Sequence, residues 1–269
     1  MIELKNISYH YPDSTAAIAD ICFSVTEGEK LVVAGANGAG KSTLFLLLNG
    51  ILKPRKGEYF FDGEKIGYSK RELLALRQQV GIVFQEPDSQ LFSASVYEEV
   101  AFGPLNMELS RDEVRRRVDS TLAALDIESL KDRPPHLLSY GQKKRVAIAS
   151  VLAMNPRIII FDEPTAGLDP AHAAEIIVLL EKLHKGGKTI IISTHDMNFA
   201  YQWAGRMVVL HKGCVVGQGT PNEVFANEEL LKQSQLELPF ILQVFKAMNT
   251  DAKNPETMDE LIEHIKTRA

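Results

Sequence analysis

The sequence predicts an α/β protein built on a parallel sheet. Two continuous apolar runs of strand length, Ile158–Phe161 and Thr189–Ile192, are typical of strands buried on both faces, as parallel strands are. The segment of about 171–185 between them has a helical pattern and completes a strand–helix–strand unit. A third apolar run, 31–33, leads into a glycine cluster and then into the helix-forming segment 43–50.

The first 70 residues predict additional strands. Alternating apolar residues indicate strands within 2–7 and 18–25, ahead of the run at 31–33. Asp62-Gly63 is a turn signal between two apolar stretches and predicts a hairpin. A short strand is then expected over Val80–Phe84.

The middle of the chain becomes helical from about residue 86 to 155. The spacing of Ser110 and Glu113 matches a capping box, which predicts the start of a charged helix. A second helix is predicted over Gln142–Met154.

Two more strands, within 207–210 and 215–217, precede a charged helical tail. The length alone predicts one or two domains, and the chain beyond Pro221 has a helical pattern.

The composition excludes several classes of protein. The 269 residues carry 30 Lys and Arg against 35 Asp and Glu, a net charge of −5, which argues against nucleic-acid binding. Cys22 and Cys214 are far apart and offer no zinc-site spacing. Apolar runs are shorter than a spanning helix needs, and the first residues do not resemble a signal peptide. We expect a cytosolic chain that does not cross a membrane alone.

Residues 35–42 match the pattern GxxxxGK[ST] between a strand and a helix. Glycines allow backbone N–H groups to converge on phosphate oxygens, Lys41 can reach the β and γ phosphates, and the Ser42 hydroxyl can bind Mg²⁺. A chance glycine-rich turn is the alternative, and the flanking elements disfavour it. The predicted nucleotide-binding residues are Gly35, Ala36, Asn37, Gly38, Ala39, Gly40, Lys41, Ser42 and Thr43.

Two carboxylates, Asp162 and Glu163, end the apolar strand at 158–161. Adjacent strand residues point in opposite directions, so the two acids can do different work. Asp162 suits the Mg²⁺ shell, and Glu163 suits polarising the attacking water. Two acids at the end of a strand are usually solvated and have no catalytic role. Their occurrence together with a phosphate-binding loop favours the catalytic interpretation.

Residues 138–142, Leu-Ser-Tyr-Gly-Gln, resemble the signature motif LSGGQ of ATP-binding-cassette (ABC) ATPases. Other family motifs have counterparts in the same order: Tyr11 resembles the adenine-stacking aromatic, Gln85 the Q-loop glutamine, Ala166–Asp169 the D-loop and His195 the switch histidine. The resemblance covers about residues 1–220, which implies one domain over 1–220, with a helical subdomain at about 86–155, followed by a helical C-terminal region over 221–269. Tyr140 departs from the usual glycine, and we expect its side chain to point away from the phosphate.

The resemblance implies a P-loop NTPase fold of ABC type, with a mixed or parallel core sheet, an antiparallel β subdomain and a helical subdomain. It also implies that two such domains close head to tail over two ATP molecules, each site using residues of both chains. Its implied catalytic residues are Lys41, Gln85, Glu163 and His195; its Mg²⁺ ligands are Ser42, Gln85 and Asp162; its ATP-binding residues in trans are Ser139, Gly141, Gln142 and Asp169.

One branch of the family fits best. Gln85–Phe92, continuing to Gly103-Pro104, resembles the energy-coupling-factor ATPases of metal-ion and vitamin importers, and segments 141–156 and 162–170 look most like the homodimeric cobalt-importer ATPases. The resemblance implies an ATPase at the cytoplasmic face of the membrane that energises import of a transition-metal ion, cobalt by preference, through integral membrane subunits. The alternatives are a nickel or vitamin importer of the same type and, less favoured, a soluble non-transport ABC ATPase.

The tail adds a second indication of this branch. Gln235–Pro239 resembles its LxLP element. An apolar helix face follows, which folds either onto its own domain or against a second copy of the chain, and dimerisation is favoured. The face consists of Phe240, Ile241, Val244, Phe245 and Met248.

Overall fold

The computed structural model describes residues 1–13, 15–248, 254–255 and 257–268. Its centre is a six-stranded sheet in the order β10-β9-β3-β8-β7-β6, in which all neighbours are parallel except β10, which is antiparallel to β9. The prediction of a parallel sheet is therefore confirmed. The strands are β3 (Lys30–Ala34), β6 (Val80–Val83), β7 (Ile158–Phe161), β8 (Thr189–Ser193), β9 (Arg206–His211) and β10 (Cys214–Gly219).

A smaller antiparallel sheet has the order β2-β1-β4-β5. Its hairpin turns at Asp62 and Gly63, which have φ of 49° and 82°, as the sequence signal predicts. The sheet consists of β1 (Ile2–His10), β2 (Ala16–Val25), β4 (Lys56–Phe61) and β5 (Glu64–Lys65).

Alternate residues of the central strands pack on opposite faces. In β3, Leu31 and Val33 pack with α1 (Lys41–Leu48) and with the antiparallel sheet, while Val32 and Ala34 pack with the other helices. Because both faces are covered, β7 and β8 are buried along their whole length. That burial explains why their sequences are continuously apolar.

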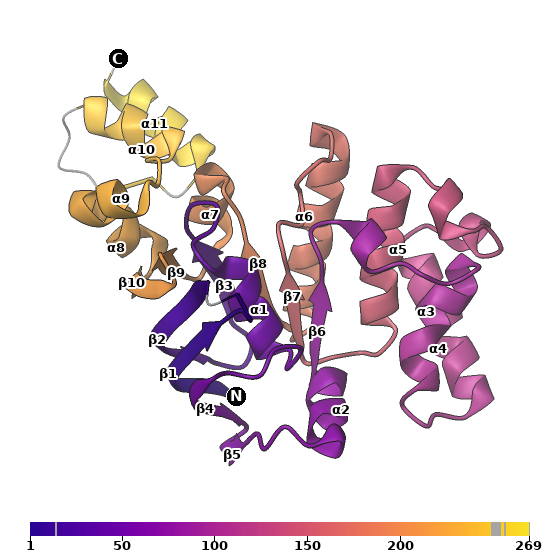
Figure 1. Ribbon diagram of the computed structural model, residues 1–269. Helices are drawn as coiled ribbons and strands as arrows, with labels where there is room; N and C mark the ends of the chain where they lie inside the picture. The colour runs from indigo at the N-terminus through magenta and orange to yellow at the C-terminus, as the bar shows by residue number, and fades with distance from the viewer. Residues whose placement is uncertain (14, 249–253, 256, 269) are drawn as a thin grey trace.

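The helices gather in separate groups (Figure 1). Helices α3, α4 and α5 form a unit beyond β6, and α8 to α11 lie at the opposite end of the molecule, beyond β9 and β10. Helices α6 and α7 follow β7 and β8. The bounds are α2 (Lys70–Gln79), α3 (Val96–Leu105), α4 (Arg111–Ala124), α5 (Tyr140–Leu152), α6 (Pro170–Lys185), α7 (Met197–Trp203), α8 (Pro221–Ala226), α9 (Glu228–Ser234), α10 (Phe240–Ala247) and α11 (Met258–Arg268), with single 3₁₀ turns at Pro87–Ser89, Glu128–Leu130 and Pro135–Leu137.

The capping box predicted at Ser110 is only half formed. The Ser110 hydroxyl accepts the N–H of Glu113 at 3.3 Å, but the Glu113 carboxylate accepts hydrogen bonds from Arg116 and Arg117 instead of reaching back. Charge-assisted bonds to guanidinium are stronger than a bond to a main-chain amide. They hold the pKa of Glu113 at about 2, with the bond from Arg116 as the largest cause.

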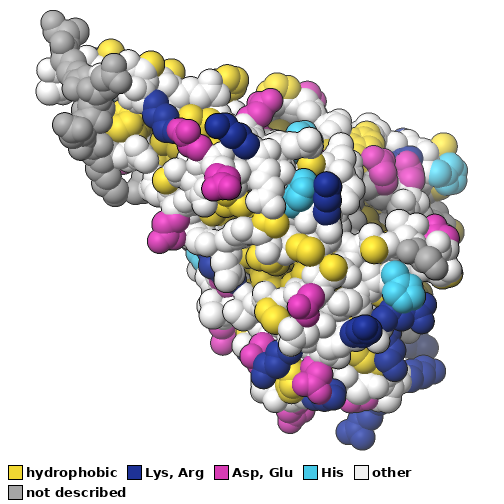
Figure 2. All heavy atoms as spheres, turned by 60° about the vertical axis from the view of Figure 1, so that its left-hand side comes forward, with side chains coloured by type: hydrophobic (Ala, Val, Ile, Leu, Met, Phe, Trp, Pro, Cys, Tyr) yellow, Lys and Arg dark blue, Asp and Glu magenta, His cyan; other side chains and the backbone are white. Residues whose placement is uncertain are grey.

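The apolar face predicted in the C-terminal region is partly buried in its own chain and partly exposed to solvent. Ile241 and Phe245 are buried in the main core of their own chain, and Met248 packs against it. Phe240 and Val244 are 69% and 44% exposed. Figure 2 shows hydrophobic side chains at the surface of this C-terminal region, at the upper left of the view.

Candidate active site

The glycine-rich loop between β3 and α1 has a shape that only glycine permits at two positions. A Cβ on Gly35 would lie 2.4 Å from the carbonyl oxygen of Leu210, and one on Gly40 would lie 2.6 Å from that of Ala17. Gly40 also has a φ of 107° as it begins α1. The loop therefore presents its main chain at the N-terminus of a helix, where an anion is stabilised.

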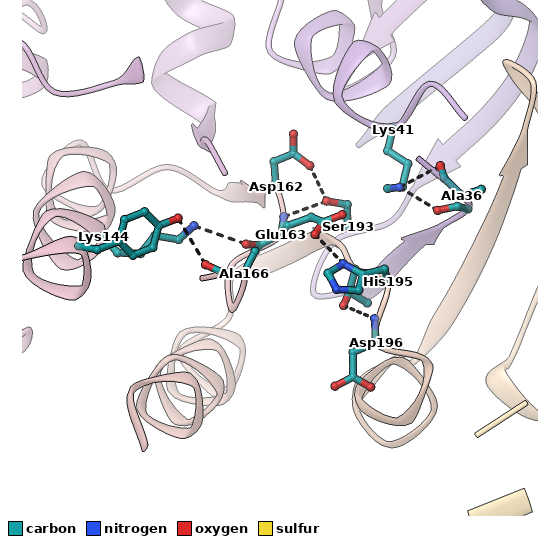
Figure 3. A network of polar contacts seen from close by, with 12 residues as sticks. Ala36, Lys41, Lys144, Asp162, Glu163, Ala166, Ser193, His195 and Asp196 are labelled. Carbon is teal, nitrogen blue, oxygen red and sulfur yellow. Dashed lines mark hydrogen bonds and ion pairs between the residues drawn. The ribbon is translucent and has the colours of Figure 1, made fainter. Parts of the chain in front are cut away.

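Lys41 extends back over this loop. Its Nζ donates to the carbonyl oxygens of Gly35 at 2.8 Å and Ala36 at 3.2 Å. The side chain is buried, and burial lowers the pKa of its ammonium, while the carboxylates of Glu163 and Asp162 oppose that shift. The cation is thus held between the loop and the two acids, where phosphate would lie (Figure 3).

Ser193 joins the carboxylate of Asp162 to the main chain of Glu163 after β7. Its buried hydroxyl donates to Asp162 Oδ1 at 2.5 Å and accepts the N–H of Glu163 at 2.9 Å. Glu163 has a φ of 46°, an uncommon value for a residue other than glycine, and such strain is often found at functional sites. Sequence reasoning did not identify Ser193; its place two residues before His195 was the available signal.

His195 lies against Glu163. Its Nδ1–H donates to Glu163 Oε2 at 2.7 Å, and its side chain is 70% exposed. This bond fixes the ring and leaves Nε2 as the atom available to a ligand.

The nucleotide-binding residues predicted from the sequence meet around two adjoining cavities. The first, of about 290 Å³, has space for a nucleotide's phosphate end and is bordered by Tyr11, whose hydroxyl is 3.1 Å from Thr43 Oγ1. Gly35, Ala36 and His195 border the second, of about 570 Å³. Ala39 is buried in the core and borders neither. The predicted residues around the first are Tyr11, Asn37, Gly38, Gly40, Lys41, Ser42, Thr43, Gln85, Asp162 and Glu163.

The predicted magnesium ligands are among them. Ser42, Gln85 and Asp162 offer hydroxyl, amide and carboxylate oxygens to one cavity, and Mg²⁺ prefers oxygen ligands. The donor set therefore fits a magnesium ion bound with phosphates. The described residues hold no group of three His, Cys, Asp or Glu side chains suited to a metal ion.

The residues predicted to act in trans gather away from these cavities. Ser139 caps α5: its hydroxyl accepts the N–H of Gln142, whose side-chain oxygen accepts the N–H of Ser139. Asp169 caps α6 and bonds the ring of His172, which lies beside Gly141. The main-chain N–H of His172 is the largest cause of a lowered pKa at Asp169. Ser139 and Asp169 are exposed, as a surface that meets another molecule requires.

Tyr140 packs against the D-loop of its own chain. A Cβ on Gly167 would lie 3.0 Å from the tyrosine ring, so the ring rests on the D-loop. The Tyr140 hydroxyl lies 3.4 Å from the carbonyl oxygens of Gln85 and Ala166. Its pKa is raised, mainly by burial.

Lys144, one turn further along α5, is a residue that sequence reasoning missed. Its Nζ donates to the carbonyl oxygen of Gln85 at 2.7 Å and to that of Glu163 at 3.4 Å. Only 1% of the residue is exposed, and burial lowers its pKa to about 8 against the opposing charge of Glu86. In Figure 3, Lys144 and Lys41 lie on opposite sides of the Asp162–Glu163 segment.

Comparison with known proteins agrees with this geometry. The family model described as ABC transporter matches residues 18–166, which is more than half of the chain. The chain therefore belongs to the ABC transporter family, and it is an ATP-hydrolysing subunit with the ABC ATPase fold.

Within the family, the similar proteins point to one branch. The chain is 53% identical over 239 residues to the energy-coupling factor transporter ATP-binding protein EcfA of Methanothermobacter thermautotrophicus, covering 89% of this chain and 77% of that protein. It is 48% identical to EcfA of Methanocaldococcus jannaschii, covering 93% and 89%.

Two solved structures give the same picture. CbiO1 of Clostridium perfringens, part of the ABC transporter complex cbiONQ, is 47% identical with a TM-score of 0.76, over 93% of this chain and 98% of that chain. A dimeric ATP-binding cassette bound to ADP and phosphate after hydrolysis is 32% identical with a TM-score of 0.75, over 82% of this chain and 99% of that chain.

We expect Glu163→Gln to keep nucleotide binding and to lower kcat by about 10²- to 10⁴-fold, the range for loss of a general base, because an amide does not accept the proton of water. Phosphate release measures the rate, and titration with a fluorescent nucleotide measures binding. Glu181→Gln is the control, since Glu181 pairs with Lys30 and does not border the cavity. An unchanged hydrolysis rate in Glu163→Gln would show that Glu163 is not the base.

Proposed function

We propose that this chain is the ATP-hydrolysing subunit of an energy-coupling-factor importer, that its cargo is a transition-metal ion, cobalt by preference, and that the ion crosses through partner membrane subunits. The names of its relatives and the cbiONQ complex of its structural neighbour support this branch. Nickel or vitamin import by the same machinery is the alternative.

We infer the catalytic roles from the geometry of the site together with the resemblance to the family. The N–H groups of the loop and Lys41 hold the β and γ phosphates, which stabilises charge that develops on the transferred group. Glu163 accepts a proton from the attacking water, and His195, oriented by Glu163, contacts the γ-phosphate. Magnesium bound by Ser42, Gln85 and Asp162 would neutralise phosphate charge. Tyr11 stacks on the adenine.

A second copy of the chain completes the site in this proposal. The exposed surface around Ser139, Gly141, Gln142 and Asp169 lies away from the cavity of its own chain and would face the γ-phosphate bound by the other. ATP then joins the two copies, and hydrolysis releases them, which provides the two states that a transporter needs.

An apolar groove lies next to the segment that follows β6 and contains Gln85 (the Gln85 loop). This groove is the observation that carries the transport proposal. It encloses about 430 Å³ between α2, α3 and α5 and is lined by Phe92 and Phe102, which contact each other edge to face and are 66% and 50% exposed. Large exposed apolar side chains in a hollow mark an interaction site. We infer that a helix of a membrane subunit docks here.

Gln90 connects this groove to the site. It lines the groove, accepts the N–H of Phe84 at 3.1 Å and donates to the carbonyl oxygen of Ala147 in α5 at 2.8 Å. A helix seated in the groove would therefore act on the residue before Gln85. This link favours a membrane partner over a free, non-transport ATPase.

The chain's place in the cell follows from the same proposal. Within the part of the chain that the structure describes, no helix combines the length and the apolar character needed to cross a membrane. We propose that the chain is held at the cytoplasmic face by its membrane partners, and that it does not bind nucleic acid.

We expect membrane subunits that co-purify with the chain to import cobalt in an ATP-dependent manner, and to do so faster than they import nickel. Uptake of each ion into vesicles containing the complex measures this preference. Complexes assembled with Glu163→Gln serve as the control, since uptake should stop while assembly persists. Equal or faster nickel uptake would reassign the cargo, and uptake of neither ion would point to a vitamin.

We expect Phe102→Asp to prevent co-purification with the membrane subunits, because a carboxylate buried in an apolar groove without a partner costs several kcal/mol. Hydrolysis by the isolated chain should stay within about twofold of the unaltered rate, since surface substitutions usually change stability by less than ~0.5 kcal/mol. Val178→Asp on α6 is the matched control, because Val178 is 67% exposed and lies outside the groove. Normal assembly with Phe102→Asp would remove the groove as the docking site.

We also propose that the C-terminal region 221–269 contributes to dimerisation through the exposed part of its apolar face. We expect Phe240→Asp combined with Val244→Asp to convert a dimer to a monomer in a mass measurement, while the buried side chains keep the region folded. Val178→Asp should leave the dimer mass unchanged. A dimer that persists in the double variant would assign dimerisation to other surfaces.

A further inference from the structure

We propose that Lys144 is a positioning residue that joins the Gln85 loop to the main chain of Glu163, so that the apolar groove and the catalytic carboxylate are mechanically connected through α5. The inference rests on the proposed function, since it takes Glu163 as the base and the groove as the place where a partner docks.

The first support is where the Lys144 ammonium lies. It donates to the main-chain carbonyl of Gln85 at 2.7 Å and to that of Glu163 at 3.4 Å, so one cation joins two loops that leave different strands. The residue is almost fully buried. Placing a cation in the interior is costly unless its donors are satisfied, so these two carbonyls are what hold it there.

The second support is the set of contacts that fixes the Glu163 backbone. Its N–H is held by Ser193, and its carbonyl also accepts the N–H of Ala166 at 3.2 Å. Lys144 relates the main chain of Glu163 itself, with its left-handed φ, to the helical unit. From this main-chain position the Glu163 carboxylate lies 2.7 Å from His195 Nδ1.

Tyr140 reinforces the same connection. It stands four residues before Lys144, on the same face of α5. Its hydroxyl lies 3.4 Å from the carbonyl oxygen of Gln85, which Lys144 also contacts, and 3.4 Å from that of Ala166. The Lys144 ammonium and the Tyr140 hydroxyl, both on α5, thus contact the Gln85 loop and the segment that contains Glu163 and Ala166.

The far end of α5 reaches the groove. Ser150 and Val151 line it, and Gln90 bonds both the Ser150 hydroxyl and the carbonyl of Ala147. A helix moves as a rigid body over this length, so a partner that displaces the C-terminal part of α5 also displaces Lys144. The groove and Glu163 are therefore linked by one element.

Substitution of Lys144 by Met tests the proposal. We expect Lys144→Met to lower kcat for ATP hydrolysis about 10- to 100-fold, the scale of a small misplacement of a catalytic group, with KM for ATP within about twofold. The matched control is Lys188→Met: Lys188 also donates to main-chain carbonyls, those of Asn155 and Pro156, at the other end of β7. It should lose stability and keep kcat within about twofold.

Equal kcat changes in the two variants would overturn the proposal, as would a raised KM with unchanged kcat, because either result indicates a general structural role. Lys144→Gln provides the rescue, since its shorter amide keeps a donor, and its kcat should lie between those of the wild type and Lys144→Met. A Gln variant as slow as the Met variant would show that the donor does not matter.

Thermal melting and nucleotide titration establish that the variants are folded. If Lys144→Met does not fold, Lys144→Gln carries the test alone, and an unchanged kcat then overturns the proposal. Glu163→Gln is measured in parallel to separate the two hypotheses. If it hydrolyses ATP normally, the proposed role of Glu163 is wrong; if it is inactive while Lys144→Met has normal kcat, only the positioning role is wrong.

Discussion

The structure depends on the parallel register of four neighbouring strands. Val83, Phe161, Ile192 and Val32 lie side by side across β6, β7, β8 and β3, so the four strands end at one edge of the sheet. The Gln85 loop, the two acids, His195 and the phosphate loop leave from that edge in the same order. Segments far apart in sequence thereby converge without depending on any single long-range contact.

Once these segments meet, buried lysines and one buried serine hold them in relation to one another. Lys41 bonds carbonyls of the phosphate loop, Lys144 bonds carbonyls after β6 and β7, and Ser193 joins Asp162 to Glu163. The two lysines bond main-chain carbonyls, whereas Ser193 accepts the main-chain N–H of Glu163 and donates to the Asp162 carboxylate. Such a network keeps the buried polar groups of these loops hydrogen-bonded.

The strands and most site residues were predictable because their signals are local. Apolar runs predicted β7 and β8, and the glycine pattern predicted the loop at 35–42, from neighbours in sequence alone. Lys144 and Ser193 were missed, since their roles arise from contacts 59 and 30 residues away. The short helices α2 and α7 were also missed. The helix start predicted at Ser110 is confirmed, but the reciprocal half of its capping box does not form, because Glu113 has cationic partners that a spacing rule does not weigh.

Ser139 has a further consequence for which residues the signature position tolerates. Its hydroxyl starts α5 by accepting the N–H of Gln142, and in the proposed dimer the same hydroxyl faces the partner's nucleotide. Ser, Thr, Asp and Asn all serve as helix N-caps. Asp would bring a negative charge toward a phosphate, and Asn lacks a hydroxyl. Two separate demands, one of folding and one of chemistry, thus narrow the choice at this position to the small hydroxyl-bearing residues.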